Sequence, residues 1–287
     1  MSEFAIRTEN LKYTYAANTP FETPAINDIS VSIERGSFTC LIGHTGCGKS
    51  TLIQHFNGLL KPTEGKIYIN DSEVTNKELK QLRKNVGLLF QYPEHQLFEE
   101  TVYKDVAFGL KNYDFSEEEK DAKIRQSILA VGLSEDILER SIYELSGGQK
   151  RRAAIAGVFV TEPEILILDE PTAGLDPKGR DEILNMIKEF HQKKQVTVIL
   201  VSHSMEDVAR LADYIIVMNN GRVEMEGIPK DIFVNKDKLE GMGLSSPQIT
   251  ELMIELNRIN PDINKNCFTV EEAVKNILNI LKGQGTC

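Results

Sequence analysis

The segment from residue 43 to residue 50 constrains this chain more than any other, because it reads Gly-His-Thr-Gly-Cys-Gly-Lys-Ser and matches G-x-x-x-x-G-K-[ST]. It lies between the apolar run Phe38–Ile42, a predicted strand, and a predicted helix that starts near Lys49 and ends before Pro62. Glycines let consecutive backbone amides point at an anion, and the helix N-terminus behind them carries roughly half a positive charge. Lys49 would then reach the β- and γ-phosphates, and Ser50 would offer a hydroxyl to Mg²⁺. The motif predicts a nucleoside triphosphate site and leaves kinases, GTPases and ATPases open.

A second feature is an apolar run that ends in two carboxylates. Ile165–Leu168 is followed by Asp169 and Glu170. A parallel strand presents its carboxyl end to the ligand crevice of an α/β sheet. Asp169 could hold Mg²⁺ directly or through water, and Glu170 could polarise the water that attacks the γ-phosphate. Carboxylates are common in turns, so it is the position downstream of a phosphate loop that favours this interpretation.

Residues 145–149 read Leu-Ser-Gly-Gly-Gln and predict another helix start. Ser146 would be the N-cap and Gln149 would stand at the third helical position. A simple cap does not explain Gly147 and Gly148, because glycine weakens a helix by up to about 1 kcal/mol per residue. The chain therefore has two helix N-termini suited to anions, and about 100 residues separate them.

The remaining pattern predicts an α/β layered fold. The early strands are predicted at Phe4–Arg7, Ile29–Glu34, Phe38–Ile42, Lys66–Asn70 and Val86–Phe90. Capping-box patterns at Thr75-x-x-Glu78 and Ser116-x-x-Glu119 indicate helix starts, and residues 101–160 are mainly helical. Continuous apolar runs at Ile165–Leu168 and Val196–Val201 are typical of parallel strands buried on both faces, and helices are predicted near 178–191 and 204–211.

The last 60 residues differ in character. Ser246-Pro247 predicts an N-cap followed by proline at the first helical position. Thr269-x-x-Glu272 predicts the cap of a second helix. Both helices carry wide apolar stripes, which favour either packing against the rest of the chain or a protein–protein interface.

Composition excludes several classes of protein. The 287 residues are 41% apolar and 26% charged, which excludes wholesale disorder. The net charge of −10 argues against a protein that binds nucleic acid over its whole surface. We find no apolar run of the roughly 18–20 residues that cross a bilayer and no signal-peptide pattern, so any membrane role is expected to go through a partner. Four cysteines without C-x-x-C spacing favour a reducing cytosol.

The phosphate loop, the Leu-Ser-Gly-Gly-Gln segment, the acidic strand and the later His203 together resemble the ATPase subunit of ABC transporters. The resemblance covers residues 3 to about 228. It implies an α/β P-loop NTPase of ABC type at 1–228, with an N-terminal antiparallel β subdomain, a RecA-like parallel-sheet core and a helical signature subdomain at about 93–160. Residues 229–287 would form a C-terminal helical domain. The resemblance also implies a head-to-tail dimer, in which the phosphate loop of one subunit and the signature of the other clamp each ATP.

The resemblance assigns a role to each site residue. Glu170 and His203 would be catalytic, with His203 holding the γ-phosphate and the attacking water. Gln91 would sense Mg²⁺ and the membrane partner, and Asp176 would make the cross-dimer contact of the loop after the acidic strand. The implied ATP-binding residues are Tyr15, Gly43, His44, Thr45, Gly46, Cys47, Gly48, Lys49, Ser50, Thr51 and Gln91. The signature residues on the partner's ATP would be Ser146, Gly147, Gly148 and Gln149, and the implied metal ligands are Ser50, Gln91 and Asp169.

Three of these assignments have structural alternatives. His203 follows an apolar strand, where a capping or core histidine would look the same. Gln91 could be any polar residue at a strand end. Tyr13 and Tyr15 point to the same strand face, so the period of two does not decide which of them stacks on adenine, and Tyr15 is the prediction.

The segment Gln91-Tyr-Pro-Glu-His-Gln-Leu-Phe-Glu-Glu-Thr101 resembles a narrower group. Together with Gly43-His-Thr-Gly46, Ala156-Gly-Val158 and the C-terminal appendage, it is similar to the second ATPase of energy-coupling factor (ECF) transporters, which are prokaryotic ABC importers of vitamins or trace metal ions. This implies ATP and Mg²⁺ as cofactors, and a peripheral place on the cytoplasmic face of the cell membrane. The implied partners are a second ATPase in a heterodimer, a transmembrane coupling protein and an exchangeable substrate-binding membrane protein. The C-terminal helices would help to hold the dimer, and no nucleic acid is expected.

Cys47 departs from the usual phosphate loop, where serine or alanine is more frequent. One interpretation is an inert small side chain. The other is a reactive thiolate, since the oriented amides and Lys49 would lower the pKa of the thiol and ATP would protect it from alkylation.

Other functions remain open from the residues alone. A soluble ABC ATPase acting on nucleic acid or ribosomes usually has two cassettes or a long coiled coil, whereas about 95 residues separate Lys49 from Leu145 here. The ATPase of a conventional ABC transporter is a further alternative. A nucleotide-gated scaffold without hydrolysis is disfavoured by the complete set of Asp169, Glu170 and His203.

Overall fold

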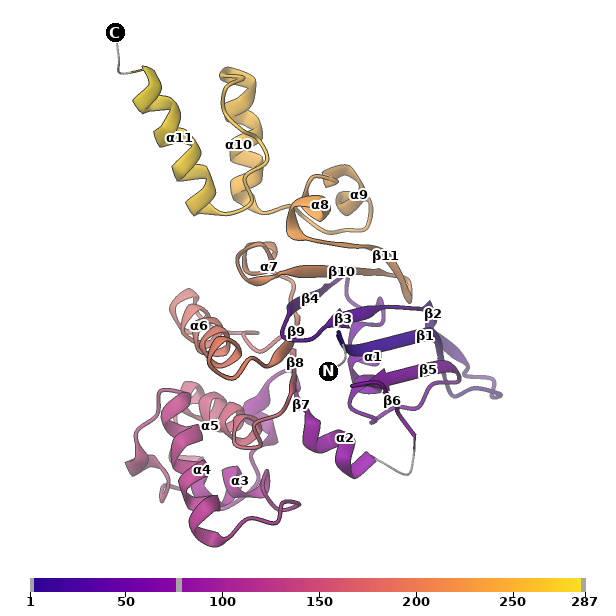
Figure 1. The fold of residues 1–287 in the computed structure, drawn as a ribbon, viewed down its shortest axis with the longest axis vertical. Coiled ribbons are helices and arrows are strands. Elements are labelled where there is room, and N and C mark those ends of the chain that lie inside the picture. The colour runs from indigo at the N-terminus through magenta and orange to yellow at the C-terminus, as the bar shows by residue number, and fades with distance from the viewer. Residues whose placement is uncertain (1–2, 76–78, 285–287) are drawn as a thin grey trace.

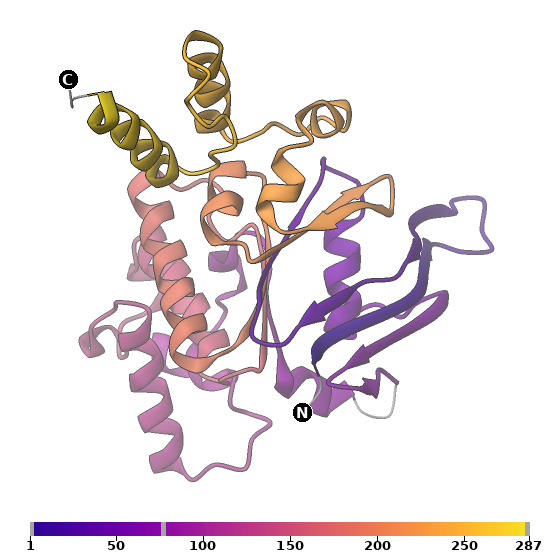
Figure 2. The ribbon, with the colours of Figure 1, turned by 45° about the horizontal axis from the view of Figure 1, so that its top comes forward.

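The computed structural model describes residues 3–75 and 79–284. An antiparallel sheet and a parallel sheet lie side by side, a lobe of helices extends from one end of the parallel sheet, and a pair of C-terminal helices projects from the other side (Figures 1 and 2). The predicted α/β class is confirmed. Among the described residues, no helix is long and apolar enough to cross a membrane.

The antiparallel sheet is built around β1 (Phe4–Tyr15), which pairs with β2 (Thr23–Ile29), β3 (Ser32–Glu34) and β5 (Glu64–Ile69), while β6 (Ser72–Glu73) pairs with β5. The prediction of one strand over 29–34 is wrong, because β2 and β3 are separate strands. The buried Thr8 hydroxyl donates to the Ile29 carbonyl and accepts from the Val31 amide, both at 3.0 Å. This side chain of β1 bonds the backbone at the break between β2 and β3, both of which pair with β1.

The parallel sheet has the order β11-β10-β4-β9-β8-β7, in which β11 alone is antiparallel among the described strands. Its strands are β4 (Phe38–Ile42), β7 (Val86–Leu89), β8 (Ile165–Asp169), β9 (Thr197–Val201), β10 (Tyr214–Asn219) and β11 (Arg222–Gly227). Alternate residues of β8 enter two different hydrophobic clusters, Ile165 and Ile167 on one face and Leu166 and Leu168 on the other. Burial on both faces explains the continuous apolar runs. The hairpin of β10 and β11 was not predicted, because β11 alternates exposed and half-buried residues at the edge of the sheet.

Helices cover the parallel sheet and form the lobe. They are α1 (Lys49–Phe56), α2 (Leu79–Asn85), α3 (Val102–Phe108), α4 (Glu117–Ala130), α5 (Gly147–Phe159), α6 (Pro177–Lys194) and α7 (Met205–Leu211), with 3-10 turns at Pro93–Gln96, Glu135–Ile137 and Ile142–Glu144. The capping box of Ser116 and Glu119 is confirmed. That of Thr75 falls partly outside the described residues. Helix α1 ends at Phe56, before Pro62 as predicted, and Gly58 beyond it adopts the left-handed φ of 68° that is common past helix ends.

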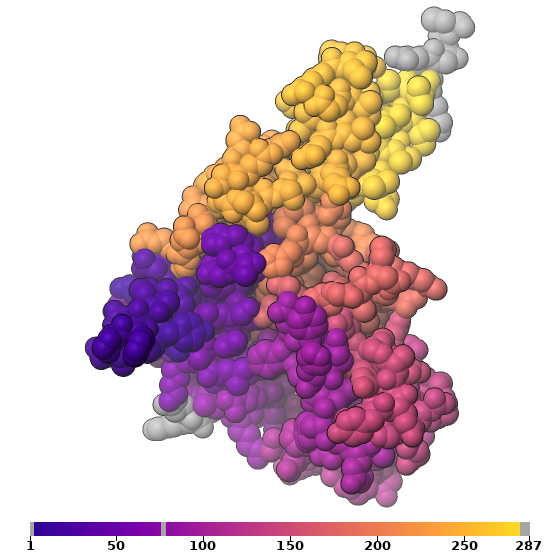
Figure 3. Space-filling model, turned by 180° about the vertical axis from the view of Figure 1, so that it is seen from behind, coloured from indigo at the N-terminus to yellow at the C-terminus, as the bar shows by residue number. Residues whose placement is uncertain are grey.

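The C-terminal region contains α8 (Pro229–Phe233), α9 (Lys236–Gly241), α10 (Gln248–Ile259) and α11 (Val270–Gln284). Figure 3 shows this region projecting from one end of the main body. The prediction of Ser246 as the N-cap of α10 is wrong. Its side chain is buried, and Pro247 occupies the cap in an extended conformation. The box of Thr269 and Glu272 is confirmed, since each backbone amide donates to the other's side chain at 3.3 and 3.2 Å.

Candidate functional site

The loop between β4 and α1 forms a cradle of backbone amides with one cation. Gly48 has φ 103°, and a Cβ there would lie 2.6 Å from the Ala25 carbonyl oxygen, so glycine is required. The buried Lys49 folds back over the loop, where its ammonium donates to the Gly43 carbonyl at 2.7 Å and the His44 carbonyl at 3.1 Å. The loop therefore places positive charge at a helix N-terminus, the arrangement that binds phosphate.

Asp169 ends β8 beside this loop. Its carboxylate is 7% exposed and is hydrogen-bonded by the Ser50 hydroxyl. Burial raises the pKa of Asp169, and Ser50 and Lys49 partly offset that effect. The structure thus brings together an ionisable carboxylate, a hydroxyl and an ammonium, as the sequence predicted.

Glu170 is held from both sides. Its backbone adopts φ 49°, which is uncommon for a residue with a side chain, and its amide donates to the Val201 carbonyl at 3.1 Å. One carboxylate oxygen lies 2.7 Å from His203 Nε2, and the other accepts from Gln91 Nε2 at 3.0 Å. Because Gln91 follows β7 and His203 follows β9, the strands on each side of β8 supply one partner each.

Tyr15 and Tyr13 have different surroundings at the end of β1. The Tyr15 hydroxyl lies 3.1 Å from the Thr51 hydroxyl in the first turn of α1, and the side chain is 39% exposed. Tyr13 packs edge-on against His55 and Tyr15, with 4.8 Å between ring centroids in each case. Of the two side chains, Tyr15 is the more exposed and is the one that contacts the first turn of α1.

The signature segment, residues 145–149, lies apart from the residues around the phosphate loop. Ser146 caps α5 and forms the predicted capping box with Gln149. Helix α5 belongs to the lobe with α3 and α4, away from α1 (Figure 1). A Cβ on Gly147 or Gly148 would meet nothing within 4 Å, so the packing of this chain does not require glycine there. Asp176, in the loop after β8, caps α6 by accepting from the Gly179 amide at 3.2 Å.

Sequence analysis missed an ion pair that joins three parts of the site. Arg151, 3% exposed in α5, donates to both carboxylate oxygens of Glu94 at 2.7 and 2.9 Å and to the Ala173 carbonyl at 2.8 Å. Burial acts to raise the pKa of Glu94, but the hydrogen bond and charge of Arg151, together with a backbone hydrogen bond and the nearby His95, outweigh it and leave that pKa below its ordinary value. The pair fixes the segment after Gln91 against the helix that begins at the signature. No sequence signal joins two residues 57 positions apart.

The residues present fit ATP with Mg²⁺. A glycine cradle with a lysine suits phosphates. Mg²⁺ prefers oxygen ligands and keeps several waters or phosphate oxygens, so the Ser50 hydroxyl and the Asp169 carboxylate suit it. The described residues contain no group of three or more His, Cys, Asp or Glu side chains placed to hold a metal ion.

Comparison with known proteins defines the class. Residues 26–173 match the family described as ABC transporter, and these residues include the phosphate loop, the signature and the acidic strand. The chain belongs to this family. Its architecture agrees, because the solved structure of cbiO1 from Clostridium perfringens, part of the ABC transporter complex cbiONQ, superposes with a TM-score of 0.75 at 37% identity over 91% of this chain and 97% of that one.

The curated relatives point to a narrower group within the ABC transporter family. The energy-coupling factor transporter ATP-binding protein EcfA2 of Acetivibrio thermocellus is 54% identical over 97% of this chain and 99% of its own length. The protein of the same name from Clostridium tetani is 55% identical over 98% and 99%. A dimeric ATP-binding cassette, MJ0796, in a post-hydrolysis state bound to ADP and Pi has a TM-score of 0.70 at 28% identity, over 78% of this chain and 98% of that one. The predicted membership of the energy-coupling factor group is confirmed.

The surroundings of Cys47 favour the interpretation of an inert small side chain over that of a reactive thiolate. The side chain is buried, and burial raises the pKa of the thiol more than Lys49, with its ammonium 3.8 Å from Sγ, lowers it. We therefore expect iodoacetamide at pH 7.5 to label Cys47 much more slowly in the folded chain than in the chain unfolded in guanidinium. Peptide mass spectrometry measures this, with Cys47→Ser identifying the peptide. Labelling in the nucleotide-free folded chain faster than in the unfolded chain would contradict the expectation.

The raised pKa of Asp169 predicts that the stability of the fold depends on pH. Burial raises its pKa in the folded chain, so the ionised carboxylate destabilises the fold above that pKa, and the penalty disappears as pH falls below the unfolded-state value of about 3.9. Without nucleotide or Mg²⁺, Asp169→Asn is expected to raise the melting temperature at pH 7.5, and the gain should vanish near pH 4. Exposed Asp237→Asn is the control. A gain that does not change with pH would count against burial as the cause.

Proposed function

We propose that the chain binds ATP with Mg²⁺ and hydrolyses it to energise an ECF-type importer, through one of two composite sites in an ATPase dimer. The observation that carries the proposal is the position of Glu170, aligned by both Gln91 and His203 beside the phosphate loop. Family membership supports ATP hydrolysis coupled to transport. The names of the relatives do not favour a conventional transporter or a soluble ATPase acting on nucleic acid.

The proposed chemistry follows from charge and position. Lys49 and the loop amides bind the β- and γ-phosphates, and Tyr15 stacks on the adenine. Glu170 accepts the proton of the attacking water, and Gln91 and His203 keep its carboxylate aimed at that water. His203 then contacts the γ-phosphate. Bound Mg²⁺, held by Ser50, Asp169 and Gln91, supplies charge neutralisation for the phosphate oxygens.

The proposed composite site explains the signature glycines. Exposed amides at a helix N-terminus, with open space around Gly147 and Gly148, leave room for the γ-phosphate of an ATP bound to a partner subunit. Asp176 would make the contact across the same interface. We propose a head-to-tail heterodimer with a second ATPase.

The C-terminal helices supply a second surface for that partner. Exposed apolar side chains follow one another along α10 and α11: Leu252, Ile259, Val270, Val274, Leu278 and Leu281. Apolar rows of this kind on a soluble chain mark interaction sites. We propose that they help to hold the two ATPases together.

The membrane partner is proposed to dock near Gln91–Thr101. Tyr92 and Phe98 are exposed in this segment, and Phe98 packs edge-on against the exposed Phe108 of α3. Since Gln91 bonds Glu170, movement of this surface reaches the catalytic carboxylate directly. The proposed partners here are a transmembrane coupling protein and an exchangeable substrate-binding membrane protein, with this chain peripheral on the cytoplasmic face.

Replacing Glu170 with Gln tests the proposed base. We expect the assembled complex to keep ATP binding and to lose hydrolysis by at least about a hundredfold, because the amide cannot accept the proton. The variant should also accumulate the ATP-bound dimer in size-exclusion chromatography. Phosphate release and nucleotide binding are measured in parallel. Glu189→Gln on the exposed side of α6 is the matched control, and Lys49→Ala should instead weaken ATP binding itself. Full turnover by the Glu170→Gln complex would remove Glu170 as the base.

Affinity purification tests the proposed assembly. The chain, tagged at its N-terminus and extracted from membranes in mild detergent, is expected to retain a second ABC ATPase and small multi-span membrane proteins, which mass spectrometry identifies. An untagged strain controls for background. Recovery with ribosomes or DNA in the soluble fraction would overturn the transport proposal while leaving the ATP site intact.

A further inference from the structure

The catalytic His203 lies in a turn that side chains fix on both sides. The Ser204 amide donates to the buried Ser202 hydroxyl at 3.1 Å. Ser204 also caps α7, since its hydroxyl accepts from the Asp207 amide at 3.3 Å. The same hydroxyl lies 3.2 Å from an oxygen of the Glu206 carboxylate, to which it donates. These bonds restrain the backbone of the turn that carries His203.

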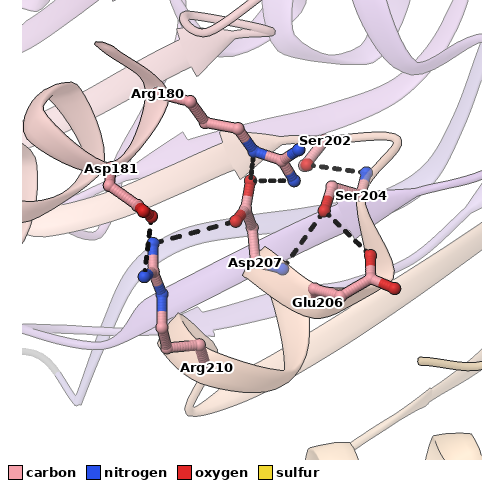
Figure 4. A network of polar contacts seen from close by, with 7 residues as sticks. All are labelled: Arg180, Asp181, Ser202, Ser204, Glu206, Asp207 and Arg210. Carbon is pink, nitrogen blue, oxygen red and sulfur yellow. Dashed lines mark hydrogen bonds and ion pairs between the residues drawn. The ribbon is translucent and has the colours of Figure 1, made fainter. Parts of the chain in front are cut away.

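Helix α7 is in turn locked to α6, which begins directly after the Asp176 loop. Both Nε and an Nη of Arg180 donate to the buried Asp207 carboxylate at 2.7 Å. Arg210 bonds Asp181 at 2.9 Å and lies 3.8 Å from Asp207 (Figure 4). Burial raises the pKa of Asp207, and the two arginines act against that rise. The network makes the starts of α6 and α7 one rigid unit.

Glu206 connects this unit to the C-terminal helices. Its second carboxylate oxygen accepts from the backbone amide of Gln248, the first residue of α10, at 3.2 Å. A carboxylate at a helix N-terminus is stabilised by the helix dipole and by a donor that has no partner within the helix. One carboxylate thus joins the cap of α7 to the start of α10.

The C-terminal pair is also anchored through Phe268, which precedes α11, is 5% exposed in the main hydrophobic cluster and has its ring centroid 5.8 Å from that of Phe233 in α8. The buried residues Met253, Cys267 and Ala273 of the α10–α11 pair form a cluster of their own, separate from the two main clusters. A groove of about 790 Å³, lined by Glu206, Leu252 and Glu271 among others, separates the pair from α6 and α7. Glu206 and Arg180 also line the cavity on the other side, which contains Glu170 and His203. Glu206 therefore lines both cavities and contacts the start of α10 directly.

We propose that Glu206 is a positioning residue that couples the C-terminal helical pair to His203. This rests on the proposed role of His203 in hydrolysis. Docking of α10 on Glu206 holds the Ser204 hydroxyl and the first turn of α7 in place, and so keeps His203 on Glu170. Movement of the pair away from this docked position releases Glu206 and lowers the turnover rate without changing the phosphate loop.

A proline substitution isolates this one hydrogen bond. Gln248→Pro removes the donated N–H at the first helical position, where proline is well tolerated, and Pro247 before it already has the extended conformation that a following proline requires. Gln248→Ala keeps the N–H and is the matched control. Glu206→Ala removes the acceptor. Glu271→Gln, in the same groove on α11, controls for loss of negative charge.

The four variants and the double variant Glu206→Ala/Gln248→Pro are compared as full-length chains in the assembled complex. We expect Gln248→Pro and Glu206→Ala each to lower kcat roughly fivefold with KM for ATP unchanged, and the double variant to be no slower than either. Both controls should keep the wild-type kcat. Wild-type kcat in Gln248→Pro, or additive losses in the double variant, would overturn the proposal.

Hydrogen exchange separates this inference from the proposed function. Gln248→Pro and Glu206→Ala are expected to speed amide exchange in residues 203–208 by several-fold, with no change in the phosphate loop, and Gln248→Ala should leave exchange unchanged. This readout needs no turnover. If the wild-type complex does not hydrolyse ATP, the proposed function fails while exchange still decides the coupling. Unchanged amide exchange in residues 203–208 in both variants would contradict the proposed coupling and leave the proposed function unaffected.

Discussion

Parallel pairing of β8 with β7 and β9 is the constraint on which the site depends. The register sets Leu168 opposite Leu89 of β7 and Leu200 of β9, so the three strands end at the same edge of the sheet. Only then do Gln91 and His203 reach the two oxygens of one carboxylate. The core below this edge is apolar on both faces, and such a sheet resists the one-residue slip that would turn every side chain to the opposite face.

Local signals predicted much of the fold and most of the site. The phosphate loop, the capping boxes at Ser116, Ser146 and Thr269 and the buried strands each depend on residues within about ten positions, where spacing specifies the structure. The features that the sequence did not predict depend on contacts between residues that lie far apart in the chain. Thr8 divides β2 from β3 across more than twenty residues, and Arg151 finds Glu94 across 57. The two interpretations of Cys47 stayed open for a related reason, because the loop sequence shows the neighbouring lysine but not the burial that outweighs its effect on the pKa of the thiol.

Two site residues, Asp169 and Glu170, are held in states that lower the stability of the fold. Asp169 is a buried carboxylate with a raised pKa, and Glu170 has a left-handed backbone that a residue with a side chain rarely adopts. The surrounding structure holds both, since the sheet fixes the backbone on either side and Lys49 and Ser50 face Asp169. Active sites commonly combine such locally unfavourable features with a rigid scaffold. Here the scaffold is the same parallel sheet that aligns the partners of Glu170.

The open space around Gly147 and Gly148 means that the stability of this chain does not depend on these glycines, whereas its proposed function does. Alanine at either position meets no atom within 4 Å and improves the helix by up to about 1 kcal/mol. A screen for thermostable variants of the isolated chain would therefore select the loss of both glycines. In the proposed composite site, the damage would fall on an ATP held mainly by the partner subunit, so a substitution in this chain would impair a nucleotide pocket that belongs mostly to another chain. A gain in the stability of the isolated chain would then accompany a loss in the assembled dimer.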